Sequence, residues 1–218
     1  MGLWNYWKRN MGINLHNRDC MLALKEFKDN QFELAIVDPP YGIDIIKNGN
    51  VGGSNAAKHK EYKIKDWDKK TPDTKYFIEL QRVSKNQIMF GANYYISKIK
   101  NCNSRCWIVW DKDNTGNFAD CELAWTSFNT SVRKFKWRWN GMIQQNMKNK
   151  EIKIHPTQKP VKLYEWLLMN YAKEGGSGSI AIACHNLGFD LEGYELDTEY
   201  FEAATKRLKQ HTKQQRLF

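Results

Sequence analysis

Apolar positions fall into two patterns along the chain, and each pattern predicts a kind of element. Apolar runs of strand length, several of them rich in β-branched or aromatic residues, predict strands at 13–16, 32–37, 87–90, 106–110, 122–128 and 189–194. Apolar residues at helical spacing predict helices at 19–28, 71–83, 160–171, 177–187 and 197–208. Asp19, Thr71 and Asp197 are suitable N-caps, and Pro72 and Pro160 suit the first turn of a helix. The basic tail from Lys209 is expected to fray.

The strand at 32–37 ends directly at Asp38-Pro39-Pro40-Tyr41. In open α/β sheets, ligands bind at the carboxyl ends of strands. Two prolines fix the backbone and remove two donors, which leaves free carbonyls in a rigid turn. The Asp38 carboxylate and the Pro39 carbonyl can each accept one N–H, and Tyr41 can stack on a ring. This set suits a planar group with an exocyclic amine, such as adenine or cytosine.

Length and charge narrow the class of protein. A chain of 218 residues can fill one core, which predicts a single domain over 1–218. Its net charge of +10 favours a polyanionic partner, although a basic surface without a partner is also common. No apolar run is long enough to span a membrane, and no signal peptide is evident at the start. The five scattered cysteines form neither a disulfide framework nor a zinc pattern, so we expect a reducing cytoplasm and no metal.

Three polar or mixed segments carry two interpretations each. Residues 42–71 are rich in glycine and lysine, which predicts either a mobile flap that closes on DNA phosphates or a solvated insertion. In 132–139, aromatic and basic residues alternate; we favour a strand with its aromatic face in the core and leave the role of its charges open. Amides and lysines in 140–153 suit either target-base recognition or a hairpin loop, and the residues do not rank the two.

A second motif, His155-Pro156-Thr157-Gln158-Lys159-Pro160, and a glycine-rich turn follow in this order. Together with Asp38–Tyr41, they resemble the amino-methyltransferases that modify DNA, in their β arrangement with the catalytic motif first. The resemblance covers nearly the whole chain. It implies a three-layer, Rossmann-like α/β fold with a mostly parallel sheet and one reversed strand.

The resemblance also implies the reaction and its residues. The expected reaction transfers a methyl group from S-adenosylmethionine to adenine N6 in duplex DNA after base flipping, or to cytosine N4 as the second choice. Its catalytic half covers about 1–150 and its cofactor half about 151–218. The implied catalytic residues are Asp38, Pro39, Pro40 and Tyr41. The implied cofactor contacts are Gly176, Ser177, Gly178 and Glu195, with Asp38 shared and with Asp19 and Thr157 as weaker candidates.

One part of the family pattern is absent. The helix at 160–171 continues through Lys173-Glu174 straight into Gly175, without the apolar strand and acidic residue that should precede the glycine turn. Either the strand is deleted, which would give a degenerate enzyme, or residues of the protein are missing from the sequence at this point. We favour the second explanation because the pattern is intact on both sides.

Two functions of other classes remain open. A non-catalytic remnant would bind DNA without cofactor, and an RNA or protein amide methyltransferase would also suit Asp38–Tyr41, because an amide is flat. A homodimer and a paired restriction nuclease are compatible with the family, and the sequence decides neither.

Overall fold

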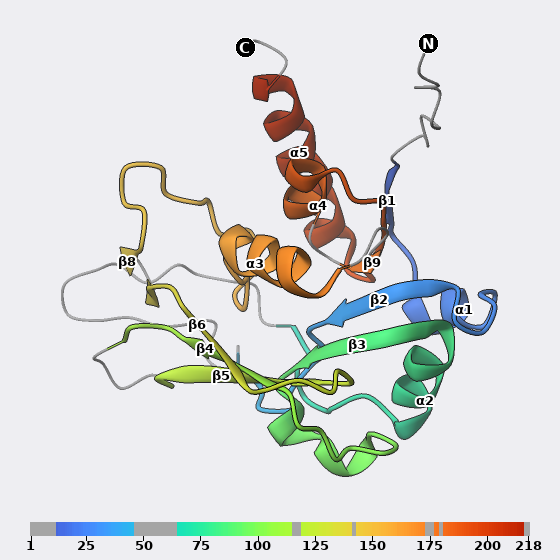
Figure 1. The fold of residues 1–218 in the computed structure, drawn as a ribbon. Helices are drawn as coiled ribbons and strands as arrows, with labels where there is room; N and C mark the ends of the chain where they lie inside the picture. Colours follow the sequence, from blue (N-terminus) through green and yellow to red (C-terminus); the bar gives the residue numbers. More distant parts are fainter. Residues whose placement is uncertain are drawn as a thin grey trace, which may run out of the picture.

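The computed structural model describes residues 12–45, 65–114, 119–140, 143–172, 177–178 and 181–215. Strands and helices alternate through most of the chain (Figure 1). The strands are β1 (Ile13–His16), β2 (Phe32–Val37), β3 (Ser84–Phe90), β4 (Trp107–Asp111), β5 (Cys121–Thr126), β6 (Arg133–Lys136), β7 (Trp139–Asn140), β8 (Ile143–Gln144), β9 (Ser177–Gly178) and β10 (Leu191–Tyr194). The helices are α1 (Cys20–Leu24), α2 (Thr74–Val83), α3 (Val161–Tyr171), α4 (Ala181–Leu187) and α5 (Thr198–Gln215), with two 3₁₀ turns at Ala92–Tyr94 and Ile96–Lys98.

Six strands form the main sheet, in the order β6-β4-β5-β3-β2-β9. The pairs β6–β4, β3–β2 and β2–β9 are parallel, whereas β5 runs antiparallel to both β3 and β4. The expected mostly parallel α/β sheet with one reversed strand is therefore confirmed. In such a sheet, the parallel strands β2, β3 and β9 present their carboxyl ends at one edge.

Helices cover both faces of this sheet, which gives the three expected layers (Figure 1). On one face, α3 and α4 pack over Ile36, Ile88 and Ile108 in the larger core. On the other face, α2 packs through Phe77 and Leu80 against Met89 and Trp125. Side chains that alternate along β2 and β3 supply both cores, because successive residues of a strand point to opposite faces. The sheet is thus buried on both sides where it carries Asp38.

A two-residue strand lies where the family pattern has a longer one. Ser177 and Gly178 do not begin a helix, as the pattern at 177–187 predicts, but form β9 and pair in parallel with Ala35 and Ile36. The helix starts only at Ala181. β9 has two residues and contacts β10, but β10 forms ladder bonds only with β1 among the described strands. The sheet is therefore divided in two at the place where a longer strand would join it.

Four other predictions about elements need correction. The first helix ends at Leu24 rather than at residue 28, although Asp19 caps it through Met21 N. Asp73, not Thr71, caps α2, because its carboxylate accepts the Lys75 N–H. The segment 132–139 is divided between β6 and β7. The tail from Lys209 continues as helix to Gln215 instead of fraying.

Parts of several predictions lie outside the described residues. These are residues 46–64 of the expected flap at 42–71, residues 141–142 of the segment 140–153, and Gly176 of the expected cofactor turn. Within the part that is described, no helix combines the length and apolar character needed to cross a membrane.

Candidate functional site

The Asp38 corner, residues 38–41, follows β2 where this strand leaves the sheet. Its backbone turns at once, because Pro39 and Pro40 cannot continue the ladder. The Tyr41 hydroxyl donates to Asp38 Oδ1 at 2.7 Å, so the ring and the carboxylate are fixed relative to one another. Pro39 is buried and Pro40 is half-buried. The structure thus places the four predicted catalytic residues together, while their roles remain a prediction.

Asp68, which lies 27 positions after Tyr41 in the sequence, holds the backbone of this corner. Its Oδ1 accepts the backbone N–H groups of Tyr41 at 2.7 Å and Gly42 at 3.1 Å, and its Oδ2 accepts that of Ile45 at 3.0 Å. The Asp68 residue is only 3% exposed. A buried carboxylate with three backbone donors is well satisfied and therefore rigid. Asp68 fixes the backbone of the corner and the first residues after it.

The Tyr41 ring packs closely against two residues that follow β3. Tyr94 stacks on it at 5.1 Å between ring centroids, with 14° between the planes, and is itself about half exposed. Gly91 has a φ of +70°, and a Cβ built there would lie 2.1 Å from Tyr41 Cε1. Only glycine fits both the left-handed backbone and this close approach. The position of the Tyr41 ring therefore depends on Gly91.

A buried lysine connects the corner to a second carboxylate. Lys159 Nζ lies 2.6 Å from Asp38 Oδ2 and 3.1 Å from Glu122 Oε2, and its side chain is 2% exposed. Glu122 Oε1 in turn pairs with Lys112 Nζ at 2.5 Å. We name the alternating series Asp38, Lys159, Glu122 and Lys112 the four-charge chain. It contains two carboxylates and two ammonium groups and is formally neutral.

Burial and neighbouring charges have opposite effects on the pKa values of Asp38, Glu122 and Lys159 in the four-charge chain. Burial raises the pKa of Asp38, and Lys159 is the largest influence that lowers it. Burial raises the pKa of Glu122 too, but Lys159 and Lys112 outweigh it and the net shift is downward. Burial lowers the pKa of Lys159, while Asp38 and Glu122 raise it further than burial lowers it. Burial and the Asp38 charge raise the pKa of Tyr41, which therefore stays protonated and donates to Asp38.

The expected cofactor residues lie near the same edge of the sheets. Gly178 pairs with Ile36, so the end of β9 lies beside the end of β2, the strand that Asp38 follows. Glu195 directly follows β10, which pairs in parallel with β1, and Asp19 follows β1. The Glu195 N–H donates to the His16 carbonyl at 3.0 Å, so Glu195 lies beside the end of β1, shortly before Asp19 in the sequence. Asp19 is an N-cap, as predicted, and burial raises the pKa of Glu195.

Thr157 and His155 belong to a different contact. The Thr157 hydroxyl and His155 Nδ1 lie 3.0 Å apart, and the imidazole packs between Trp67 and Tyr200. Burial, with the nearby Lys159 charge, lowers the pKa of His155 to about 4, so the ring is neutral at pH 7. This packing joins the end of the 42–71 segment to α5. The weaker prediction that Thr157 contacts cofactor is not tested by this geometry.

Reasoning from sequence missed Lys159, Glu122, Asp68, Gly91 and Tyr94. Lys159 stands inside the His155–Pro160 motif, which was the available signal. Glu122 and Asp68 gave no signal, because an acidic residue in a strand or loop is ordinarily solvated. Their partners are far away in sequence, and only the fold brings them together.

The basic segments have ordinary partners on the protein itself. Phe135 and Trp137 pack against the larger core, which confirms that the aromatic face of 132–139 is internal. On the other face, Lys134 pairs with Asp111, and Lys136 and Arg138 pair with Asp113. Segment 140–153 contains strand β8, which pairs with β7, and the loop that follows it. The Gln144 side chain donates to the Glu151 carbonyl at 2.9 Å and accepts the Glu151 N–H at 2.8 Å. Its role in recognition is untested.

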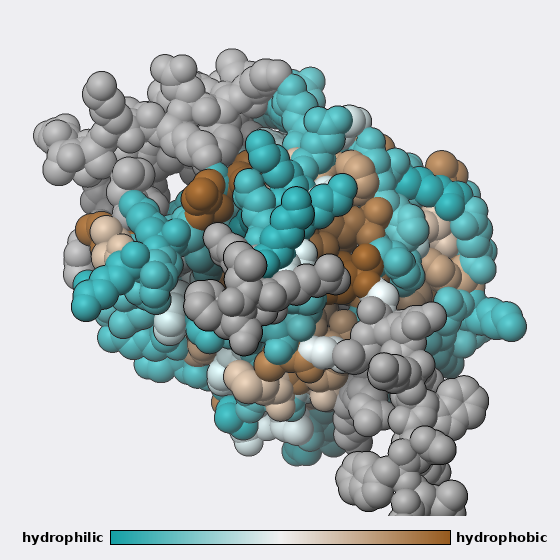
Figure 2. Space-filling view, turned by 90° about the horizontal axis from the view of Figure 1, so that it is seen from above, coloured by the Kyte–Doolittle hydropathy of each residue, from teal (hydrophilic) through white to brown (hydrophobic). Residues whose placement is uncertain are grey.

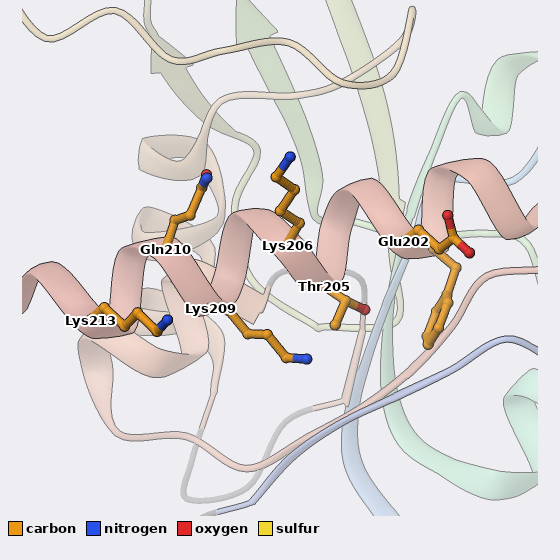
Figure 3. A pocket seen from close by; sticks show the side chains of 7 residues that line it. Glu202, Thr205, Lys206, Lys209, Gln210 and Lys213 are labelled. Atoms are coloured by element: carbon orange, nitrogen blue, oxygen red, sulfur yellow. The ribbon is translucent and has the colours of Figure 1, made fainter.

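A separate pocket lies along α5 (Figure 3). Its described lining comes from that helix alone: Phe201, Glu202, Thr205, Lys206, Lys209, Gln210 and Lys213. It contains no residue of the Asp38 corner. Over the described ranges, no cluster of three or more His, Cys, Asp or Glu side chains suits a metal ion.

Comparison with known proteins gives matches over most of the chain. Residues 122–206 match the DNA methylase family. The type II methyltransferase M.HpaI of Haemophilus parainfluenzae is 26% identical over 87% of this chain and 72% of its own length. The type II methyltransferase M2.DpnII of Streptococcus pneumoniae is 24% identical over 94% of this chain and 92% of its own length. The match to M2.DpnII spans 252 residues, whereas 94% of 218 residues is about 205, so this chain is shorter inside the shared region.

Two solved structures share the fold. The M1.HpyAVI–SAM complex superposes with a TM-score of 0.55 at 20% identity, over 90% of this chain and all of the other. The cytosine-N4-specific PvuII DNA methyltransferase superposes with a TM-score of 0.57 at 12% identity, over 92% and 90%. At these identities, the likeness establishes the Rossmann-like fold.

Proposed function

We propose that this chain is a DNA methylase, and that it transfers a methyl group from S-adenosylmethionine to adenine N6 in duplex DNA. The family match supports DNA methyl transfer. The base and the residues that act on it are our proposal. The observation that carries the proposal is the Asp38 corner, where a carboxylate, a carbonyl and an aromatic ring are held together at the carboxyl end of β2.

In the proposed mechanism, the corner binds the target base after it leaves the duplex. The Asp38 carboxylate and the Pro39 carbonyl accept the two amine hydrogens. Both acceptors draw the hydrogens toward the protein, so the nitrogen lone pair is available for attack. Tyr41 stacks on the ring, and Gly91 and Asp68 fix where Tyr41 lies. Catalysis is then mainly positioning and electrostatic stabilisation.

The residues at the edge of the sheets suit S-adenosylmethionine. Glu195 and Asp19 would provide carboxylates for the ribose hydroxyls and the adenine end, and Gly178 pairs with Ile36 near the end of β2. When bound, the cofactor supplies an electrophilic methyl group. The protein residues Gly176, Ser177, Gly178 and Glu195 would hold it, with Asp38 between cofactor and base and with Thr157 as a weaker candidate.

Partners and location follow from the proposed reaction. The substrate is duplex DNA, and the protein would act in the cytoplasm. A homodimer and a cognate nuclease remain proposals from the family resemblance; sedimentation of the purified protein tests the first.

The choice of base and polymer is tested in one experiment. Equal amounts of unmethylated duplex DNA, RNA and an unrelated protein are offered together with S-adenosylmethionine, and the products are hydrolysed and analysed by mass spectrometry. We expect N6-methyladenine in the DNA fraction. N4-methylcytosine would retain the mechanism and change the base, as the PvuII likeness makes worth testing. Methyl groups in RNA or protein alone would overturn the proposal.

A further inference from the structure

We propose that Lys159 is a positioning residue for methyl transfer, which keeps Asp38 ionised and oriented, and that Glu122 opposes it. The inference rests on the proposed function and extends it to two residues outside the Asp38 corner. It assigns a chemical role to the lysine of the His155–Pro160 motif.

Contacts on both sides of Lys159 in the sequence fix its position. Trp139 Nε1 donates to the Gln158 carbonyl at 2.8 Å, and the next residue after Lys159, Pro160, is the N-cap of α3. The backbone is therefore fixed on both sides of the lysine. Its Nζ lies 4.8 Å from the centre of the Phe90 ring and 3.3 Å from the Tyr41 hydroxyl. The ammonium is thus directed into the core toward Asp38.

Asp38 needs such a cation if it is to accept an amine hydrogen. A buried carboxylate tends to take up a proton, and the protonated form loses the acceptor strength that the proposed mechanism uses. Lys159 at 2.6 Å favours the ionised form, and Tyr41 at 2.7 Å holds the other oxygen. The lysine pairs with Oδ2, so it also fixes the rotation of the carboxylate about its last bond.

Glu122 has the opposite electrostatic effect on Asp38. It shares the Lys159 ammonium, and its negative charge disfavours a second negative charge nearby. Lys112 compensates part of the Glu122 charge from the outer end of the four-charge chain. Removing Lys159 and removing Glu122 should therefore move the ionisation of Asp38 in opposite directions. A role in folding alone would not produce this difference of sign.

The test measures single-turnover methyl transfer to duplex DNA from pH 4 to 10. The variants are Lys159→Gln, Glu122→Gln, the double variant, and Lys162→Gln as control. Lys162 is an exposed lysine at the start of α3 whose partner is Glu165, outside the site. Thermal melting and S-adenosylmethionine binding show that each variant is folded. The same proteins, labelled with ¹³C at the aspartate carboxyl groups, give the titration of Asp38 by NMR without any need for activity.

For Lys159→Gln we expect the midpoint of the acidic limb of the rate profile to move to higher pH, by about one pH unit or more. The rate should return to the wild-type value at high pH. One pH unit corresponds to about a tenfold lower rate at any pH well below the midpoint. Glu122→Gln should move this midpoint to lower pH. The double variant should return it toward the wild-type value, and Lys162→Gln should leave it unchanged. The Asp38 titration should show the same order.

Equal profiles for folded wild type and Lys159→Gln, or shifts of the same sign for both single variants, would overturn the inference. A wild-type protein that binds DNA but transfers no methyl group would overturn the proposed function instead. In that case the NMR titration alone decides whether Lys159 controls the ionisation of Asp38.

Discussion

One ammonium group stands between two carboxylates beside the proposed base site. Lys159 contacts Asp38 and Glu122 in a place that water hardly reaches. Buried ion pairs of this kind contribute little net stability, because desolvation offsets the attraction. Their retention is easier to understand if the charge on Asp38 is needed for chemistry. The proposed role of Asp38 would thus account for a lysine side chain in the core of this protein.

The close approach of Gly91 to Tyr41 gives a prediction at the same scale. In Gly91→Ala, the added Cβ would collide with the Tyr41 ring on a backbone with φ of +70°. We expect methyl transfer to fall about tenfold or more, because a small displacement of a positioning group is costly. Unfolding free energy should fall by about 1–3 kcal/mol from backbone strain.

The matched control is Gly188→Ala, at an exposed glycine with φ of +75° after α4. It carries the backbone strain without touching the Asp38 corner, so it should lose stability and keep its rate. Denaturant titration and single-turnover kinetics are measured on both variants. A Gly91→Ala protein with a wild-type rate would show that the Tyr41 ring does not need its observed position.

At the scale of elements, the division of the sheet is the main departure from an intact fold. Among the described strands, β1 and β10 form ladder bonds with one another alone, and β10 contacts the six-stranded sheet at β9, the two-residue strand at its edge. A two-stranded unit alone is marginally stable. This chain is also shorter than M2.DpnII inside the region that the two share. An intact mass of 25.7 kDa for protein purified from its source would show that the shortening is real.

Hydrogen exchange tests the consequence for stability. We expect the amides of β1 and β10 to exchange faster than those of β2 and β3, because local opening of the smaller sheet disrupts fewer contacts. Exchange followed by mass spectrometry of peptides separates the two pairs. Equal protection of both pairs would mean that the two sheets unfold as one cooperative unit and that β9 joins them fully.

The elements also show how far sequence reasoning reached. Strand β2 was predicted with its observed ends, because an apolar run and a proline stop define it. β9 was predicted as helix, because its pairing with Ala35 and Ile36 is a backbone contact that side-chain patterns do not report. The Asp38 corner was predicted from local chemistry. Its link to Lys159 was not, since 121 positions separate the two residues and only packing joins them.

The excess of lysine and arginine over acidic residues leads to a prediction about how the protein binds DNA. Hydrophilic residues cover much of the face seen in Figure 2, and the net charge is +10. Each phosphate contact by a lysine or arginine contributes about −0.9 to the slope of log affinity against log salt. Lys148 and Lys150 are exposed in the segment 140–153. If this segment lies on DNA, replacing both by Gln should flatten the slope by up to about 1.8.

Fluorescence anisotropy with labelled duplex DNA at several salt concentrations gives the slopes. Lys85→Gln is the control, because Lys85 lies near the amino end of β3, opposite the edge that carries Asp38, and pairs with Glu33. Its slope should equal that of the wild type. If Lys148 and Lys150 leave the slope unchanged as well, DNA lies elsewhere on the protein and 140–153 is a structural loop.

The central claim is tested most directly by S-adenosylmethionine that carries a CD₃ group. Wild type and Asp38→Ala are incubated with unmethylated duplex DNA, and the nucleosides are analysed by mass spectrometry. We predict trideuterated N6-methyladenine with the wild type and at least a hundredfold less with Asp38→Ala, as is typical for loss of a preorganised group. DNA without any CD₃ label after incubation with folded wild-type protein would contradict the account.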